Sequence, residues 1–181
     1  MILILGQSML AKELHTLIPT ATIIGRPDYD FSLKEDCDRA IADYNPTVVV
    51  NTHALNQTHS TWDILTVNYT SIVYLTLGFY EKMNTGHIIN ISSTCTYWPS
   101  YPGIDTGRLC YNISKESLSL FGRHFNRATV DNKNKSTIST IELGKFDSKF
   151  NNFSGGMTVN QVASVVKDCI DRPVTAISII K

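Results

Sequence analysis

The sequence predicts a doubly wound α/β fold, in which a parallel sheet is covered by helices on both faces as a three-layer α/β/α sandwich. Short apolar segments without polar alternation recur along the chain, and longer segments with apolar residues at helical spacing separate them. Continuous apolar strands are typical of parallel sheets, and right-handed crossovers place the intervening helices on both faces. No linker, repeat or low-complexity tract interrupts the pattern, so we expect one domain over residues 1–181.

The expected elements alternate along the chain. The second helix has its own start signal, because Ser32 is followed three positions later by Glu35, as in a capping box. We expect strands at residues 1–5, 21–24, 47–50, 87–91, 136–143 and 176–180, and helices at 9–17, 32–43, about 62–83, about 110–127 and about 158–170.

Composition excludes several classes of function. The formal net charge is zero and 18% of residues are charged, which argues against a nucleic-acid patch or a polybasic membrane anchor. The apolar runs are far shorter than the roughly 20 residues that span a bilayer, and the first run, MILIL, lacks the basic residues of a signal peptide. The four cysteines show no C-x-x-C pair and no metal-ligand spacing. We therefore expect a cytoplasmic protein with free thiols and no metal site.

The turn after the first strand is a candidate phosphate loop. A dinucleotide fold needs glycines there for the tight turn, for close approach of the backbone to pyrophosphate and for helix packing. Gly6 supplies the first and Ala11 the last, but the middle glycine is absent, so a generic α/β turn remains an equal alternative. The Ser8 hydroxyl and the free N–H groups at Met9 and Leu10 are the candidate anion ligands.

The turn after the second strand contains Gly25, Arg26 and Pro27. A guanidinium at this place suits the 2′-phosphate of NADP, whereas an acidic side chain suits the free ribose hydroxyl of NAD. Arg26 therefore predicts NADP(H) over NAD(H), with an exposed loop arginine as the alternative. Asp30 is expected near the adenine.

The candidate catalytic residues are Ser93, Tyr111 and Lys115. Ser93 follows the apolar segment 87–91, and a spacing of four places Tyr111 and Lys115 on one face of the next helix. A phenol is a weak base at neutral pH, with an unperturbed pKa of about 10, but a neighbouring ammonium favours the phenolate. Tyrosine can then exchange a proton with a substrate oxygen that the serine hydroxyl holds.

These residues resemble the active-site segment of the short-chain dehydrogenase/reductase superfamily. The resemblance implies a Rossmann fold, a nicotinamide cofactor and a tetrad of Asn68, Ser93, Tyr111 and Lys115, in which Asn68 carries a proton-relay water. It also implies that Tyr111 and Lys115 lie at the cofactor, with Lys115 on the nicotinamide ribose. By the same resemblance, the adenosine is bordered by Asn51, Thr52 and His53, and the carboxamide by Gly144, Phe146 and Ser148.

The start of the chain and the segment 93–97 are more similar to the sugar-nucleotide reductases, which include the dTDP-4-dehydrorhamnose reductases. Only about forty residues follow Gly144, so we do not expect the large substrate domain of that branch. The loop aromatics Tyr97, Trp98 and Tyr101 are expected to line or cover the substrate pocket, although exposed loop packing explains them nearly as well.

The sequence thus predicts an NADP(H)-dependent oxidoreductase that interconverts a small-molecule carbonyl and an alcohol. Helices 62–83 and 110–127 carry the faces that commonly dimerise in this superfamily, which predicts a homodimer or homotetramer. Two alternatives remain open. A nucleotide-binding sensor or scaffold without chemistry fits the missing glycine, and a nucleotide-sugar epimerase, dehydratase or reductase shares the tetrad.

Overall fold

The computed structural model describes residues 1–94, 105–129, 136–144, 156–173 and 176–179. Its elements are β1 (Ile2–Leu5), α1 (Met9–Leu17), β2 (Thr22–Ile24), α2 (Lys34–Asp43), β3 (Val48–Asn51), α3 (Thr61–Leu65), the π-helical turn η1 (Thr66–Thr70), α4 (Ser71–Lys82), β4 (His87–Ser93), α5 (Thr106–Ala128), β5 (Thr137–Leu143), α6 (Val159–Asp171) and β6 (Ala176–Ile179).

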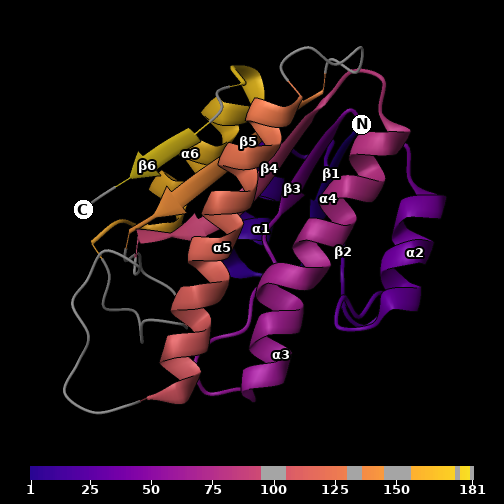
Figure 1. Ribbon diagram of the computed structural model, residues 1–181. Helices are drawn as coiled ribbons and strands as arrows, with labels where there is room; N and C mark the ends of the chain where they lie inside the picture. Colours follow the sequence, from indigo (N-terminus) through magenta and orange to yellow (C-terminus); the bar gives the residue numbers. More distant parts are fainter. Residues whose placement is uncertain (95–104, 130–135, 145–155, 174–175, 180–181) are drawn as a thin grey trace.

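The strands form one parallel sheet of six strands in the order β2-β1-β3-β4-β5-β6. Helices α2, α4 and α5 cover one face, and α1 and α6 cover the other (Figure 1). The predicted doubly wound parallel sheet is confirmed. Strand order reverses between β1 and β3, and a crevice for ligands is expected outside the carboxyl ends of strands at such a point.

One strand, β2, lies beyond β1 among the described residues, whereas the usual dinucleotide-binding order has two strands on that side. The chain runs from β2 through the loop 25–33 into α2. The outer wall of the crevice at β1 is therefore a loop.

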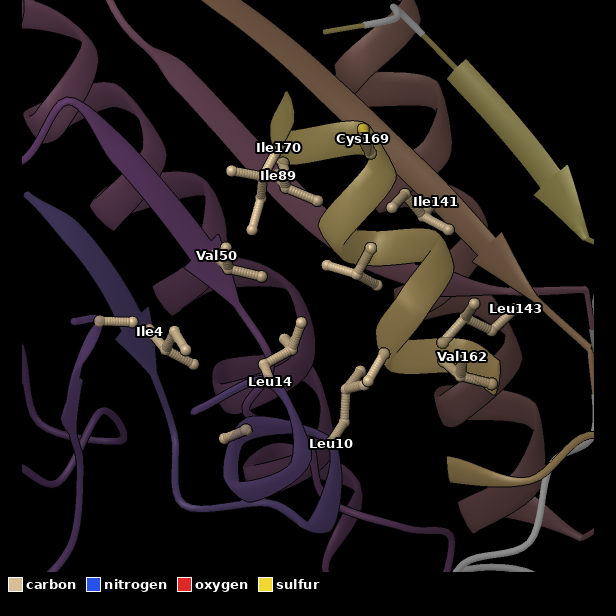
Figure 2. Packing of buried hydrophobic residues seen from close by; sticks show 14 of the residues in the cluster. Ile4, Leu10, Leu14, Val50, Ile89, Ile141, Leu143, Val162, Cys169 and Ile170 are labelled. Atoms are coloured by element: carbon tan, nitrogen blue, oxygen red, sulfur yellow. The ribbon is translucent and has the colours of Figure 1, made fainter. Parts of the chain in front are cut away.

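Two apolar clusters hold the layers together. One lies under α1 and α6, where Leu10, Leu14 and Val166 pack against Val50 and Ile89 of the sheet (Figure 2). The second lies on the opposite face, where residues of α2 and α4 pack on β1, β3 and β4. Because side chains alternate along each strand, neighbouring residues of β3 and β4 serve opposite clusters. The short strands are therefore buried on both faces, which explains their continuous apolar sequence.

Two predicted helix boundaries are wrong. The capping box at Ser32 does not form: α2 begins at Lys34 after Leu33, and the Ser32 hydroxyl donates to Asp30 instead. Helix α5 begins at Thr106, about four residues before the expected start, because the Asp105 carboxylate accepts a hydrogen bond from the Arg108 N–H as an N-cap.

The predicted long helix over 62–83 is interrupted. A π-helical turn joins α3 to α4, and in it the Ser71 N–H donates to the carbonyl of Thr66 five positions earlier. Single π turns inside helices are rare and are frequent at functional sites. No helix in the described part of the chain is long and apolar enough to cross a membrane.

Candidate active site

A cleft of about 280 Å³ opens where β1 and β3 end, near the lower limit of small-molecule sites, which run from about 300 to 1,000 Å³. Its walls come from the turn after β1, the loop after β2, the loop after β3 and the π turn. The lining residues are Gly6, Gln7, Ser8, Gly25, Arg26, Tyr29, Asp30, Phe31, Ser32, His53, Ala54, Leu55 and Val67.

Gly6 is required by the geometry of this turn. Its φ is +103°, and an added Cβ would lie 2.7 Å from the Cβ of His53. The following helix begins at Met9, so the N–H groups of Met9 and Leu10 lack partners within the helix, as predicted for an anion site. The Ser8 oxygen accepts a hydrogen bond from the Ala11 N–H at 3.0 Å, so this hydroxyl serves as the N-cap of α1.

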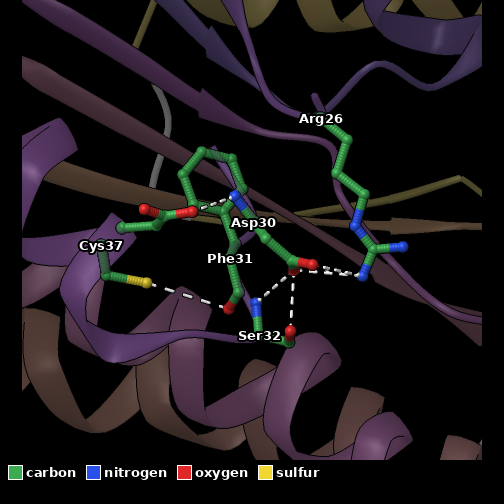
Figure 3. A network of polar contacts seen from close by, with 6 residues as sticks. Arg26, Asp30, Phe31, Ser32 and Cys37 are labelled. Carbon is green, nitrogen blue, oxygen red and sulfur yellow. Dashed lines mark hydrogen bonds and ion pairs between the residues drawn. The ribbon is translucent and has the colours of Figure 1, made fainter. Parts of the chain in front are cut away.

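Arg26 and Asp30 both line the cleft, and they are paired with each other. The Arg26 Nη2 atom lies 3.0 Å from Asp30 Oδ2 and 3.1 Å from Oδ1 (Figure 3). Ser32 donates its N–H and its hydroxyl to Asp30 Oδ1 at 3.0 and 2.7 Å. Partial burial alone would raise the pKa of Asp30, but the hydrogen bonds from Arg26 and Ser32 outweigh it and hold the pKa below its usual value. The cleft therefore contains an ion pair.

His53 lies between the turn after β1 and the helix α4. Its ring is 4.9 Å from that of Phe31, and its Nε2 atom lies 3.0 Å from the Ser71 hydroxyl. Burial, together with the charge of Lys115, lowers the pKa of His53 to about 3, so the ring is neutral. His53 thus lines the cleft and lies within electrostatic reach of Lys115, and its contact with a cofactor stays a prediction.

Asn51 and Thr52, which were expected beside the adenosine, are buried beneath the cleft. The Asn51 amide donates to Asn90 Oδ1 at 2.7 Å, and the Thr52 hydroxyl donates to the carbonyl of Leu5 at 3.0 Å. Neither is among the residues that line the cleft. Both side chains therefore connect the ends of neighbouring strands among β1, β3 and β4. Their direct contact with a ligand stays a prediction.

Asn68 lies in the π turn and is fully buried. Its side-chain oxygen accepts from the Leu55 N–H at 2.6 Å, and its amide donates to the Leu55 carbonyl at 2.8 Å. The Asn68 side chain therefore fixes the loop after β3, which forms one wall of the cleft. Its predicted role in a proton relay stays a prediction.

Ser93, Tyr111 and Lys115 lie at the interface of β4 and α5. Ser93 is the last residue of β4, and Tyr111 and Lys115 lie one turn apart on α5. Lys115 is buried, and its Nζ atom donates to the Ile91 carbonyl of β4 at 3.0 Å. The Ser92 hydroxyl donates to the Lys115 carbonyl at 2.7 Å. Residues of β4 thus bond both the backbone carbonyl and the ammonium of Lys115. These bonds fix Lys115 against the strand, one helical turn from Tyr111.

The remaining predicted residues border segments outside the described residues. Gly144 directly follows β5, the neighbour of β4 in the sheet. Phe146, Ser148, Tyr97, Trp98 and Tyr101 lie outside the described ranges. Three apolar residues that line the cleft were not predicted from the sequence: Phe31, Leu55 and Val67. Of these, only Phe31 gave a signal, as a large apolar residue in a polar loop.

No protein-family profile and no curated protein sequence matches the chain. Solved structures do match. A short-chain dehydrogenase from Burkholderia cenocepacia J2315 in complex with NADP superposes with a TM-score of 0.82 over 98% of this chain and 87% of that chain, at 13% identity. The protein has the short-chain dehydrogenase fold.

Two further structures extend the likeness within this fold. Serine dehydrogenase from Escherichia coli gives a TM-score of 0.77 at 18% identity, with 99% of this chain and 96% of that chain covered. A GDP-L-fucose synthetase from Naegleria fowleri gives 0.78 at 14% identity and covers 99% of this chain and 75% of that chain. Both the compact dehydrogenases and a sugar-nucleotide enzyme therefore share this fold, as the two sets of sequence similarities predict.

Proposed function

We propose that the protein is an NADP(H)-dependent oxidoreductase that interconverts a carbonyl and an alcohol, with Asn68, Ser93, Tyr111 and Lys115 as its catalytic tetrad. The observation that carries the proposal is the placement of Lys115, whose buried ammonium donates to the end of β4 one helical turn from Tyr111 and close to Ser93. A binding module has no need of this arrangement. The solved neighbours include NADP complexes of a short-chain dehydrogenase and of serine dehydrogenase, which supports the cofactor.

The described part of the cleft fits the adenosine half of a dinucleotide. Gly6 allows the tight turn against His53, and the N–H groups of Met9 and Leu10 form a site for a phosphate group. Arg26 offers a guanidinium for a 2′-phosphate, and Phe31 and Leu55 offer apolar walls. By resemblance, Gly144, Phe146 and Ser148 would contact the carboxamide. The bound nicotinamide supplies or takes up the hydride.

The chain's own residues perform the proton transfer in this proposal. The Ser93 hydroxyl holds the substrate oxygen, and Tyr111 donates a proton to it in reduction or removes one in oxidation. The ammonium of Lys115 stabilises the ionised phenol, and the neutral His53 adds no competing positive charge to Lys115. By resemblance, Asn68 in the π turn would hold the water of a proton relay.

The test begins with separate titrations of the protein with NADPH and NADH, followed by cofactor fluorescence or heat. A screen of carbonyl substrates follows, and then the variant Tyr111→Phe. We expect saturable binding of NADPH, and we expect Tyr111→Phe to lower kcat by about 100-fold or more while the Kd for NADPH changes less than about twofold. A Tyr111→Phe enzyme that keeps most of its rate would refute the catalytic assignment.

The absent middle glycine favours a second candidate, a nucleotide-binding sensor without chemistry. Gln7 occupies that turn and lines the cleft, so the approach to a pyrophosphate differs from that of a full glycine loop. Tight cofactor binding with no turnover across a carbonyl panel would support the sensor. If neither cofactor binds at millimolar concentration, both candidates are wrong.

A further inference from the structure

Arg26 and Asp30 are the only charged side chains among the described residues that line the cleft, since His53 is neutral. They form an ion pair, with the Arg26 side chain 65% exposed and the Asp30 side chain 32% exposed. The Arg26 guanidinium, which predicts a preference for the 2′-phosphate, is therefore paired with the Asp30 carboxylate. Together the two side chains add no net charge to the cleft.

We infer that Asp30 is a specificity determinant that opposes Arg26 and reduces the preference of the native protein for an adenosine with a 2′-phosphate over one with a free 2′-hydroxyl. The inference rests on the proposed function, because it concerns the adenosine half of the same cleft. Arg26 favours the phosphorylated ligand, and Asp30 favours the unphosphorylated one.

The loop holds Asp30 firmly in this position. The backbone N–H and the hydroxyl of Ser32 donate to Asp30 Oδ1, and the backbone N–H of Asp30 donates to Asp36 Oδ2 of α2 at 2.6 Å (Figure 3). The Cys37 thiol donates to the Phe31 carbonyl and ties the same loop to α2. These four contacts favour the position of the Asp30 carboxylate beside Arg26.

A 2′-phosphate and a 2′-hydroxyl interact differently with the pair of Arg26 and Asp30. A phosphate monoester carries a charge of about −1.5 to −2 and is repelled by a fixed carboxylate. The guanidinium binds phosphate best through two parallel N–H bonds, and one of its amino groups is already directed at Asp30. A ribose hydroxyl carries no charge, and a carboxylate with about four acceptor positions retains room for one more donor.

The sharpest test uses adenosine 2′,5′-bisphosphate and adenosine 5′-monophosphate, which probe this half of the cleft without the nicotinamide. Binding is measured by calorimetry, and the readout is the ratio of the two Kd values. We expect Asp30→Asn to tighten the bisphosphate relative to the monophosphate by about tenfold, equivalent to about 1.4 kcal/mol. The asparagine oxygen still accepts from Ser32, so the loop keeps its main contacts.

Asp28→Asn is the matched control, because it removes the same charge from the same loop at a side chain that does not line the cleft. It should leave the ratio unchanged. A second variant, Arg26→Met, should weaken the bisphosphate about tenfold and leave the monophosphate within twofold. This variant tests the pair even if Asp30→Asn fails to fold.

The outcomes separate the inference from the proposed function. If both probes bind the native protein and Asp30→Asn leaves their ratio unchanged, the inference is wrong and the oxidoreductase proposal stands. If the folded native protein binds neither probe nor either dinucleotide, the proposed function fails and this inference fails with it.

Discussion

At the scale of single residues, two buried histidines link pH to stability. Burial lowers the pKa of His87 to about 4, and burial with the Lys115 charge lowers that of His53 to about 3, against 6.5 for an unperturbed histidine. The Nδ1 atom of His87 is buried without a hydrogen-bond partner, so a proton added there would be unsatisfied. Both rings are therefore neutral in the folded protein over the physiological range.

The sign of the pH dependence follows from these directions. Below pH 6.5 the unfolded chain binds protons that the folded protein does not, so stability falls as pH drops from 6.5 toward 4 and then 3. Between pH 7 and pH 5 we expect the free energy of unfolding to fall by up to about 2 kcal/mol for each histidine. Urea unfolding at the two pH values measures the loss.

His53→Gln and His87→Gln should each reduce this pH dependence, because glutamine does not titrate. His59→Gln is the control, since His59 lies on an exposed loop. A pH dependence that is the same in all three variants would show that the two buried histidines are not its source.

The placement of the proposed catalytic residues could be predicted from the sequence because their spacing is local. Tyr111 and Lys115 are four apart on one helix, and Ser93 ends the preceding strand. The pairing of Arg26 with Asp30 and the capping role of Ser8 depend on the course of loops whose turns no short-range pattern specifies. The sequence therefore indicates which residues gather at the site, but not which of them neutralise each other.

At the scale of elements, the π turn is the main departure from expectation. Its sequence, TVNYT, continues the apolar spacing of a helix, so the interruption has no local signal. A tertiary contact distinguishes this turn: the Asn68 side chain makes two hydrogen bonds to the backbone of Leu55. The Ser71 hydroxyl bonds the carbonyl of Val67 within the helix itself. Strands, by contrast, agree within two residues of their expected ends, because burial on both faces gives each a continuous apolar run.

Helix α5 packs closely on β5 through Gly122. A Cβ at this position would lie 2.2 Å from Thr140 Oγ1 and 3.3 Å from Thr140 Cβ. Gly122→Ala should therefore destabilise the protein by about 1–3 kcal/mol, although alanine is the better helix former by about 1 kcal/mol. Chemical denaturation measures the change in the free energy of unfolding.

A double-mutant cycle identifies the cause of this loss. Thr140 Oγ1 is buried without a hydrogen-bond partner, so Thr140→Ala removes the clashing atom at little polar cost. We expect Thr140→Ala to restore at least half of the stability lost in Gly122→Ala. Strictly additive effects of the two substitutions would contradict contact between them.

At the scale of the whole molecule, the sheet order brings distant segments to one edge. The turn after β1, the loop after β2 and the loop after β3 meet at the cleft, and β4 with α5 continues the same edge. Because one described strand lies beyond β1, the outer wall of the cleft is the loop 25–33. That loop is tied to α2 by Arg39, whose guanidinium donates to the carbonyl of Asp28, and by the Tyr29 hydroxyl, which donates to Asp43 at 2.8 Å. The residues proposed to set cofactor specificity, Arg26 and Asp30, thus lie in a loop anchored by a helix.

The predicted assembly of the protein rests on an apolar face formed by α3 and α5, which pack against each other. Trp62 is 77% exposed, and the other exposed apolar residues of this α3–α5 face are Leu65, Leu109, Ile113 and Leu120. Leu109, Ile113 and Leu120 are spaced by four and seven positions, so they share one side of α5. Exposed apolar side chains that gather on one side of a helix are typical of interaction surfaces.

We therefore propose that two copies associate through the α3–α5 face. Light scattering coupled to size exclusion should give a mass of about twice 20.2 kDa or a higher multiple. Ile113→Asp with Leu120→Asp should produce a folded monomer, because burying unpaired carboxylates in a symmetric interface costs several kcal/mol per ion. Leu33→Asp serves as the control, since Leu33 is equally exposed at the start of α2, away from this face, and should leave the mass unchanged. A mass of one chain at every concentration would contradict the proposal, and a dimer that survives the double substitution would place the interface elsewhere.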